Sequence, residues 1–491
     1  MRSRDHINSS SFTELTTSCD RLIRSGQIQA ARTTLQALEL PVPREFAQPL
    51  AHLCYRTNLF STALKILAPF VRSTSGESVI PTSLEKATYA IALVKLGSIE
   101  EGLAILESCD RSLPEVHLYA AFAFQAQWDY ARAIPNLQTY LACPNLSDYQ
   151  TAVAKLNLLA ALISTSNSAA ARPLFDQLSK DARKNGWDLI RKNLQELSCQ
   201  IAIIDSRWDE ARERLRVAMA ETQNDGSIWD FFLMKWQALI DAKADGRTEG
   251  LKSVRAEALQ LGHWETVREC DLAVALAERD QNLFDKIYAG TPFASYRQRM
   301  VDSAASWAAT PSKFDWMPFQ DLPGSRLCLE NLKLSSGELR GFAFLCRDFY
   351  RPQSVGNVHA QLFFREQFDP VSSPGRVANV MKRLRSRLKD QDIPLTVIQR
   401  RSHYFLKATS PVTVQIEIQD SLDIAGESSR YRRAISKLKN RFQEELFTSR
   451  EASSVLDLSK TSTNRFISWA LENAQLERSG QNRATLYKVS A

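Results

Sequence analysis

Apolar and small residues recur along the first 220 residues with the spacing of amphipathic helices, and the pattern repeats in units of about 34 residues. The clearest unit, 87–114, has Ala90 and Leu93 on one helical face, Gly97 in a turn and Gly102 in the next helix. A small residue at that point lets two antiparallel helices cross closely. Equivalent small residues are spaced by 32, 39, 31, 38 and 40 positions, at Ala31, Ala63, Gly102, Ala133, Ala171 and Ala211. The pattern predicts stacked helical hairpins.

This unit resembles the tetratricopeptide repeat over about residues 12–220, and weaker helical patterning continues to about Met300. The first-helix Trp of that family is absent, and Trp128 stands where a turn Gly is usual. The resemblance implies a solenoid, here 1–310, whose concave face binds a partner protein or peptide. We name no ligand residue in this region, because its large aromatics are more often packed between helices than used as contacts.

Between Thr310 and Pro323 the sequence TPSKFDWMPFQDLP has three prolines and no helical period, so 311–324 is predicted to be a linker. Alternation over 327–334 then predicts a strand, and a capped start at Ser335 and Glu338 predicts a helix to about Phe349. A short helix over 359–368 precedes a longer one over 375–390, and alternation over 395–408 predicts a hairpin.

The helix over 375–390 has one apolar stripe and a basic remainder, a pattern that suits the major groove of DNA. The hairpin carries further cations at its tip. The candidate DNA contacts are Arg376, Asn379, Lys382, Arg383, Arg387, Arg400 and Arg401. The alternative is a surface helix that docks on the repeats. His403 has no second histidine or carboxylate nearby in sequence, so a polar or structural role is favoured over metal binding.

This order of strand, helices, basic helix and hairpin resembles the winged-helix effector domain of OmpR/PhoB-type regulators, which also occurs in SARP-type activators. The match covers about 325–409 within a domain at 325–410, and VANVMKRLRSRL is its most specific part. The resemblance implies a recognition helix at 376–388 and a wing at 398–405. Arg401-Ser402-His403-Tyr404 replaces the Gly-x-Gly-Tyr turn of the family.

The last segment, 430–491, contains two short helices joined near Leu458-Ser459 and two strands around Ser479–Asn482. Thr448, Glu451, Leu458, Ser459 and Leu476-Glu477-Arg478 fit the winged helix-turn-helix of many bacterial regulators. That resemblance implies DNA contacts at Lys460, Thr461, Ser462, Asn464, Arg465, Arg478, Arg483 and Lys488. The fold also serves for dimerisation or protein docking, which stays open.

Charge separates the two ends of the chain. Residues 325–491 hold 27 Lys and Arg against 17 Asp and Glu, a net charge of +10, whereas residues 1–324 hold 35 against 38, a net charge of −3. This asymmetry suggests that only the last third meets a polyanion. A solvated basic surface would have the same composition.

Several classes of function lack sequence support. Nucleotide-binding, metalloprotease and hydrolase motifs are absent, and the cysteines and histidines are dispersed, so we expect no enzyme activity, catalytic residue, cofactor or metal. No apolar run would span a membrane and no signal peptide begins the chain, so a cytoplasmic protein is expected.

The predicted fold class is mainly α, with a TPR-like α-solenoid followed by two small α+β winged-helix domains. The leading hypothesis is a bacterial-type transcription regulator that binds double-stranded DNA and receives a protein or peptide signal through its repeats. The competing hypothesis is a non-enzymatic adaptor whose repeats and winged helices both bind proteins. RNA binding by the basic tail is a remote third. The sequence leaves the oligomeric state open.

Overall fold

The computed structural model describes residues 9–418 except 25–26, 73–79, 223–227, 305–306 and 365, and then 435, 438–439, 441–443, 445–456, 460–472, 475–480 and 485–489. Inside these ranges the side chains of 9–11, 24, 221–222, 228–229, 330, 460–462, 465, 469 and 472 are not described. The chain forms two units, residues 1–418 and 419–491. Each unit is described by itself.

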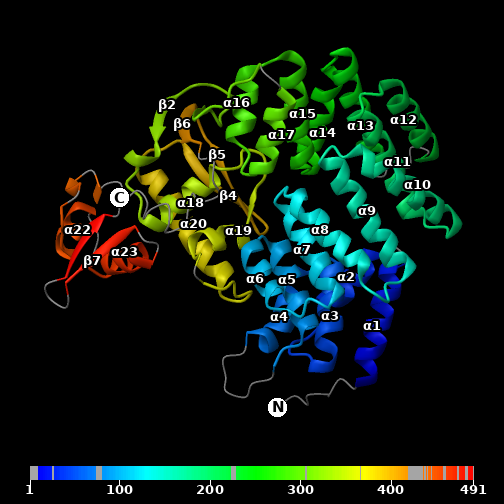
Figure 1. Cartoon of the computed structure of the whole chain (residues 1–491), viewed down its shortest axis with the longest axis horizontal. Helices are drawn as coiled ribbons and strands as arrows, with labels where there is room; N and C mark the ends of the chain where they lie inside the picture. Colours follow the sequence, from blue (N-terminus) through cyan, green and yellow to red (C-terminus); the bar gives the residue numbers. More distant parts are fainter. Residues whose placement is uncertain are drawn as a thin grey trace. The chain divides into compact units, whose positions relative to one another are not determined.

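The amino-terminal part of the first unit is a run of paired α-helices, as predicted, which follow one another in chain order in Figure 1. Their bounds are α1 (Ser9–Arg24), α2 (Ile28–Gln36), α3 (Arg44–Arg56), α4 (Phe60–Val71), α5 (Ser83–Leu96), α6 (Ile99–Glu107), α7 (Pro114–Ala126), α8 (Tyr130–Ala142), α9 (Asp148–Ser164), α10 (Ser168–Lys184), α11 (Asp188–Ile204), α12 (Trp208–Thr222), α13 (Ile228–Asp245), α14 (Glu249–Leu261), α15 (Trp264–Glu278), α16 (Gln281–Ala289) and α17 (Ala294–Ala304). We call this run the array. Among the described residues, no helix is both long and apolar enough to cross a membrane.

The small residues that predicted the hairpins all lie in second helices and are buried. They are Ala31, Ala63, Gly102, Ala133, Ala171 and Ala211. Gly102 shows why size matters, because a Cβ atom there would lie 2.9 Å from the carbonyl oxygen of Ala90. The turns between paired helices also share one backbone feature, a residue with a positive, left-handed φ. These residues are Asn58, Gly97, Trp128, Ser166 and Ser206. Trp128 therefore adopts the conformation that the family pattern gives to Gly, at a cost in backbone strain.

The rest of the first unit, which we call the module, comprises 313–418. Its elements are β1 (Lys313–Trp316), β2 (Ser325–Cys328), the 3₁₀ helix η1 (Leu329–Asn331), α18 (Ser336–Leu345), β3 (Gln353–Ser354), α19 (Val355–Leu362), α20 (Ser373–Asp390), β4 (Leu395–Arg400), β5 (His403–Ala408) and β6 (Val412–Glu417). The predicted strand over 327–334 gives way to η1 after Cys328, and the helix predicted over 359–368 lies at α19 instead.

Two small sheets frame the module helices. One has the strand order β1-β6-β2, with β6 antiparallel to β1 and parallel to β2. The other has the order β3-β5-β4, in which β5 is antiparallel to both neighbours. The segment 311–324, predicted to be a linker, is corrected here: it contains β1, whose Trp316 is buried and stacks on Phe349 at 4.6 Å between ring centroids.

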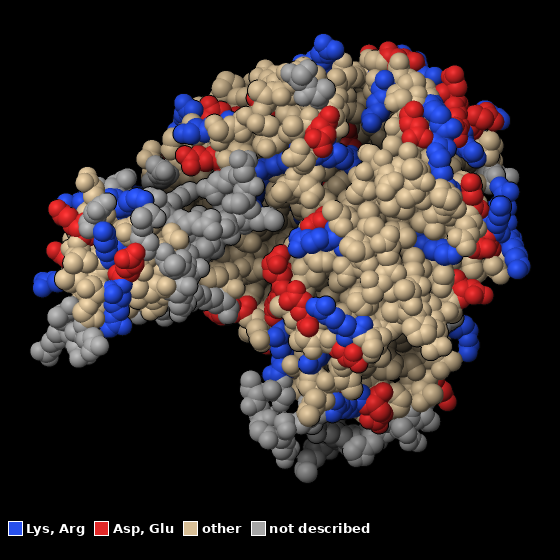
Figure 2. Space-filling view, in the orientation of Figure 1, with Lys and Arg blue, Asp and Glu red and all other residues tan. Residues whose placement is uncertain are grey.

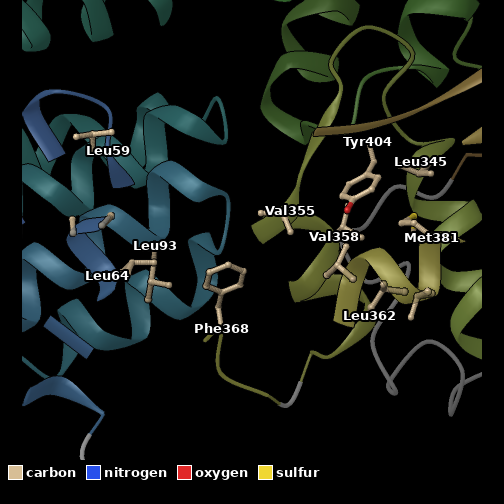
Figure 3. Packing of buried hydrophobic residues seen from close by; sticks show 14 of the residues in the cluster. Leu59, Leu64, Leu93, Leu345, Val355, Val358, Leu362, Phe368, Met381 and Tyr404 are labelled. Atoms are coloured by element: carbon tan, nitrogen blue, oxygen red, sulfur yellow. The ribbon is translucent and has the colours of Figure 1, made fainter. Parts of the chain in front are cut away.

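The module meets the array along α16, where Phe349 N–H donates to the Gly290 carbonyl oxygen at 3.1 Å and Lys286 binds Asp321, and at two junctions, the turn junction and the ionic junction. At the turn junction, Leu96, Ser98 and Glu101 of the array contact Ser354, Gly356 and Phe368 of the module. At the ionic junction, Arg268 and Asp271 of α15 bind Asp348 and Tyr350. One hydrophobic cluster runs through both parts near the turn junction, and Figure 3 shows Phe368 of the module beside Leu93 of the array.

The second unit contains α22 (Ser449–Leu456), α23 (Lys460–Glu472), β7 (Leu476–Ser479) and β8 (Leu486–Val489). The two strands are antiparallel, with Leu476 opposite Val489. Helix α22 is capped by Thr448, since Glu451 N–H donates to Thr448 Oγ1 at 3.2 Å and Thr448 N–H donates to Glu451 Oε2 at 2.7 Å. A core that includes Phe442, Phe447, Phe466 and Leu476 holds these elements together.

Candidate nucleic-acid interface

Helix α20 has one buried face and one charged face. The apolar stripe of Val377, Val380, Met381, Leu384 and Leu388 is buried against α18, α19 and β4. Because residues three and four apart share a helix face, this stripe turns the intervening polar residues outward. The exposed residues include Asn379, Lys382, Arg383, Ser386 and Arg387.

These exposed residues line a groove of about 420 Å³, together with Asp390 and with Glu338 of α18. Glu338 is itself buried and closes the capping box of α18 by accepting from Ser335 N–H at 2.8 Å. Its Oε1 lies 3.9 Å from Arg383 Nε, so one of the groove cations has a carboxylate neighbour. Among the described residues of the groove, Lys382 and Arg387 have no acidic partner within 4.0 Å and are therefore available to an anionic ligand.

Arg376 differs from the other predicted contacts on α20. Its NH1 donates to Glu366 Oε2 at 2.5 Å, and its guanidinium lies 4.1 Å from the ring centroid of Phe363. The hydrogen bond from Arg376 lowers the pKa of Glu366 and raises the pKa of Arg376. Arg376 therefore braces the loop before α20, and a phosphate would have to compete with Glu366 for it.

The predicted hairpin is present as β4 and β5, which pair from Leu395 opposite Ala408 to Arg400 opposite His403. The turn is Arg401-Ser402, and Arg401 takes a left-handed φ of 52°. Arg400 and Arg401 are both exposed, so the tip presents cations as the sequence predicts. Val355 N–H donates to the Ser402 carbonyl oxygen at 2.8 Å, which places this tip beside the first residue of α19.

Two contacts that sequence reasoning missed fix α20 within the module. Arg385 donates from Nε to the Val397 carbonyl oxygen at 2.9 Å, so this cation holds the hairpin against the helix. His359 Nε2 lies 3.0 Å from Ser373 Oγ and joins α19 to the start of α20. Burial, helped by Arg376, lowers the pKa of His359 to about 4. An isolated histidine in the sequence carries no signal for such a partner.

In the second unit, the structure places Asn464 and Arg478 on the surface and leaves Lys488 half-buried. The side chains of Lys460, Thr461, Ser462 and Arg465 lie outside the described residues, as does Arg483. Helix α23 turns Phe466, Ile467 and Ala470 into the core, so Asn464 lies off the buried stripe. The described part thus brings α23 and the β7–β8 hairpin into one small fold.

A row of alternating charges crosses successive first helices of the array, at Glu196 in α11, Lys235 in α13, Glu269 in α15 and Arg299 in α17. Lys235 binds Glu269, and Arg299 lies 4.0 Å from the same carboxylate. Burial would raise the pKa of Glu269, but these two cations outweigh it and the pKa is lowered. Trp236 Nε1–H donates to Glu196 at 2.8 Å, and burial raises the pKa of Glu196.

The acidic and basic groups of this row bind one another, so the row favours neither an anionic nor a cationic ligand. Elsewhere on the array, Lys and Arg side chains are interspersed with Asp and Glu over the face that Figure 2 shows. This mixture fits the net charge of −3 for residues 1–324. A polyanion is therefore expected at the module or the second unit rather than at the array.

No protein-family model and no curated protein matches the sequence. Among solved structures, the chain is similar to a Rap protein complexed with competence and sporulation factor, with a TM-score of 0.40 and 12% identity over 77% of this chain and 100% of that chain. It is also similar to aspartyl phosphate phosphatase F from Bacillus subtilis, with a TM-score of 0.36 and 12% identity over 63% of this chain and 98% of that chain. At these TM-scores, function has to be argued from the chain's own residues.

Proposed function

We propose that the protein is a non-enzymatic, DNA-binding transcription regulator whose array binds a partner protein or peptide. In this proposal the module is a winged helix, with α19 and α20 as the helix-turn-helix and β4–β5 as the wing. The second unit is a further winged helix, with α22 and α23 in the same roles. Because the two winged helices are linked in one chain, binding of one to DNA raises the effective concentration of the other, and the overall affinity increases.

The exposed face of α20 carries the proposal. Asn379, Lys382, Arg383, Ser386 and Arg387 offer amide, hydroxyl and cationic groups on one side of a rigid helix. Cations and hydroxyls bind phosphate oxygens, and Asn and Arg form paired hydrogen bonds to base edges in the major groove. The elements α18, β3, α19, α20 and the β4–β5 hairpin also follow one another in the order expected of a winged helix. The hairpin tip of the same module adds the exposed cations Arg400 and Arg401.

The array supports a role in partner binding because it is a long run of paired helices. Stacked helical pairs form extended surfaces of the kind that bind other chains. The array thus supplies the signal input, while the module supplies contact with DNA.

The test measures duplex binding by the full chain over a range of salt concentrations. We expect affinity to fall steeply with salt, because each neutralised phosphate releases counterions. The double variant Lys382→Glu/Arg387→Glu should bind more than about tenfold more weakly, with a salt slope smaller by about two. The matched control is Lys180→Glu/Lys252→Glu, which makes the same charge change at exposed array positions.

A salt-independent affinity, or equal losses in the two double variants, would reject the proposal for α20 and favour the adaptor. If RNA competes better than duplex DNA for the chain, the hypothesis of RNA binding by the basic tail is favoured. A parallel variant, Asn464→Ala/Arg478→Glu, asks whether the second unit contributes: a further loss of affinity is expected, and no loss would restrict DNA contact to the module.

A further inference from the structure

At the turn junction, serine side chains join the array to the first helix of the proposed helix-turn-helix through backbone carbonyl oxygens. Ser354 Oγ donates to the Leu96 carbonyl oxygen at 2.6 Å, and Ser98 Oγ donates to the Gly356 carbonyl oxygen at 3.4 Å. A Cβ atom at Gly356 would lie 2.2 Å from the Leu96 carbonyl oxygen. Only glycine allows this approach, so the α5–α6 turn sits directly on the start of α19.

The loop between α19 and α20 is covered by the array as well. Phe368 N–H donates to Glu101 Oε2 at 2.9 Å, and the Phe368 ring is 2% exposed within the cluster that contains Leu64 and Leu93. Glu101 also binds Arg72, so this acceptor is fixed from the array side. Figure 3 shows the Phe368 ring beside Leu93 of the array.

These covered parts are the ones that a helix-turn-helix directs toward the DNA backbone. The second helix enters the major groove by its amino-terminal part, while the first helix crosses the backbone. The hairpin tip lies at the same end, because Val355 N–H donates to the Ser402 carbonyl oxygen while the neighbouring Ser354 binds Leu96. The α5–α6 turn and a bound DNA strand would thus lie in adjoining positions. The middle of α20 is exposed and is not covered by the turn.

We propose that the α5–α6 turn is an intramolecular mask on the DNA-binding side of the module, and that full affinity for duplex DNA requires the turn junction to open. This inference rests on the proposed function. The ionic junction keeps the module attached while the mask is displaced, because it is made by other residues of the array, on α15. A partner that draws the array away from α19 would then raise DNA affinity.

The experiment uses Gly356→Ala in the full chain, with Gly337→Ala as the matched control. Both glycines lie in the first turn of a helix at φ values that alanine accepts, but a Cβ atom at Gly337 meets nothing within 4 Å. Gly356→Ala therefore drives the Leu96 carbonyl away without altering a cation of α20. Amide hydrogen exchange over 354–362, measured without DNA, reports opening of the turn junction. Titration with duplex DNA reports the affinity of the chain for DNA.

We expect faster exchange over 354–362 and about tenfold tighter duplex binding in Gly356→Ala, which corresponds to a wild-type chain that is open about one part in ten. Gly337→Ala should change neither. Ser98→Asp is a second, array-side variant: Asp still suits the amino end of α6, but its carboxylate faces the Gly356 carbonyl oxygen. It should act like Gly356→Ala.

Faster exchange with unchanged or weaker DNA binding overturns the mask and leaves the proposed function in place. Absence of salt-dependent duplex binding in the wild type and in both opened variants removes the proposed function and the mask together. Unchanged exchange in Gly356→Ala, in Ser98→Asp and in the variant that combines them also counts against the mask, because a mask has to be removable.

Discussion

The two junctions between array and module are held by different forces. The ionic junction buries a complete ion pair: Arg268 NH2 lies 2.7 Å from Asp348 Oδ1, both side chains are 0% exposed, and Phe293, Tyr296 and Tyr350 surround the guanidinium. The turn junction relies on backbone carbonyls, two serines and the Phe368 ring. A buried ion pair cannot lose one member cheaply, whereas an apolar and backbone contact can be weakened in small steps. The contrast suits a fixed attachment paired with a movable one.

The largest effect should come from breaking the ionic junction. Arg268→Met removes the nearer cation from the buried Asp348 carboxylate and leaves only Arg351 Nε, 3.8 Å from Asp348 Oδ2, so it should destabilise the first unit by about 3–5 kcal/mol. Chemical denaturation followed by tryptophan fluorescence measures this loss, since Trp316 lies in the module. Adding Asp348→Asn should recover part of it, because the amide oxygen can still accept from Tyr350 N–H and Arg351 N–H. A loss below about 1 kcal/mol would mean that the pair is not the fixed attachment.

Mild acid should weaken the side of the module that faces the turn junction. His359 packs against Phe368 at 5.3 Å between ring centroids, and its pKa in the folded chain is lowered to about 4 from 6.5. Between these values the unfolded chain binds a proton that the folded chain does not. Stability from the neutral histidine is therefore complete above pH 6.5 and is lost as the pH falls toward 4, by about 3 kcal/mol in all.

Unfolding measured from pH 7 to 4 in wild type and His359→Gln tests this expectation. The variant should lose less stability over the interval, while His117→Gln, in the array, should follow the wild type. Parallel curves for wild type and His359→Gln would exclude His359 as the source of the acid sensitivity.

The smallest effect should come from trimming the apolar part of the turn junction. Phe368→Leu should cost about 1–1.5 kcal/mol, because leucine refills most of the buried space. Phe364→Leu in the same loop should cost less than about 0.5 kcal/mol, since Phe364 is 39% exposed. Exchange rates over 354–362 should rise only in Phe368→Leu. Equal costs at the two positions would show that the Phe368 contact with the array adds nothing.

Local periodicity predicted much of the secondary structure. The spacing from Ala63 to Ala211 marks buried second-helix positions, and the stripe from Val377 to Leu388 marks the buried face of α20. The hairpin turn at Arg401-Ser402 was equally readable. These features depend on neighbours a few residues apart, so the sequence records them directly.

Helix bounds and the role of 311–324 were harder to predict. Strand β1 forms only because β6, about a hundred residues later, offers a partner edge, and α19 begins where β3 ends on β5. The same holds for Arg376, which reads as a free cation in sequence but binds Glu366 in a loop that folds back on α20. The composition of a segment rich in proline or arginine does not show which distant strand or side chain it will pair with.

The sequence by itself therefore determined the paired helices, the amphipathic basic helix and the segregation of positive charge, because each follows from local spacing or from counting. Only the tertiary structure decided which cations of α20 stay exposed, and that the array covers the start of α19. The contact between Ser354 and Leu96 spans 258 residues and the Arg268–Asp348 pair spans 80. Contacts over such separations arise from how the helical pairs stack, and no short stretch of sequence encodes them.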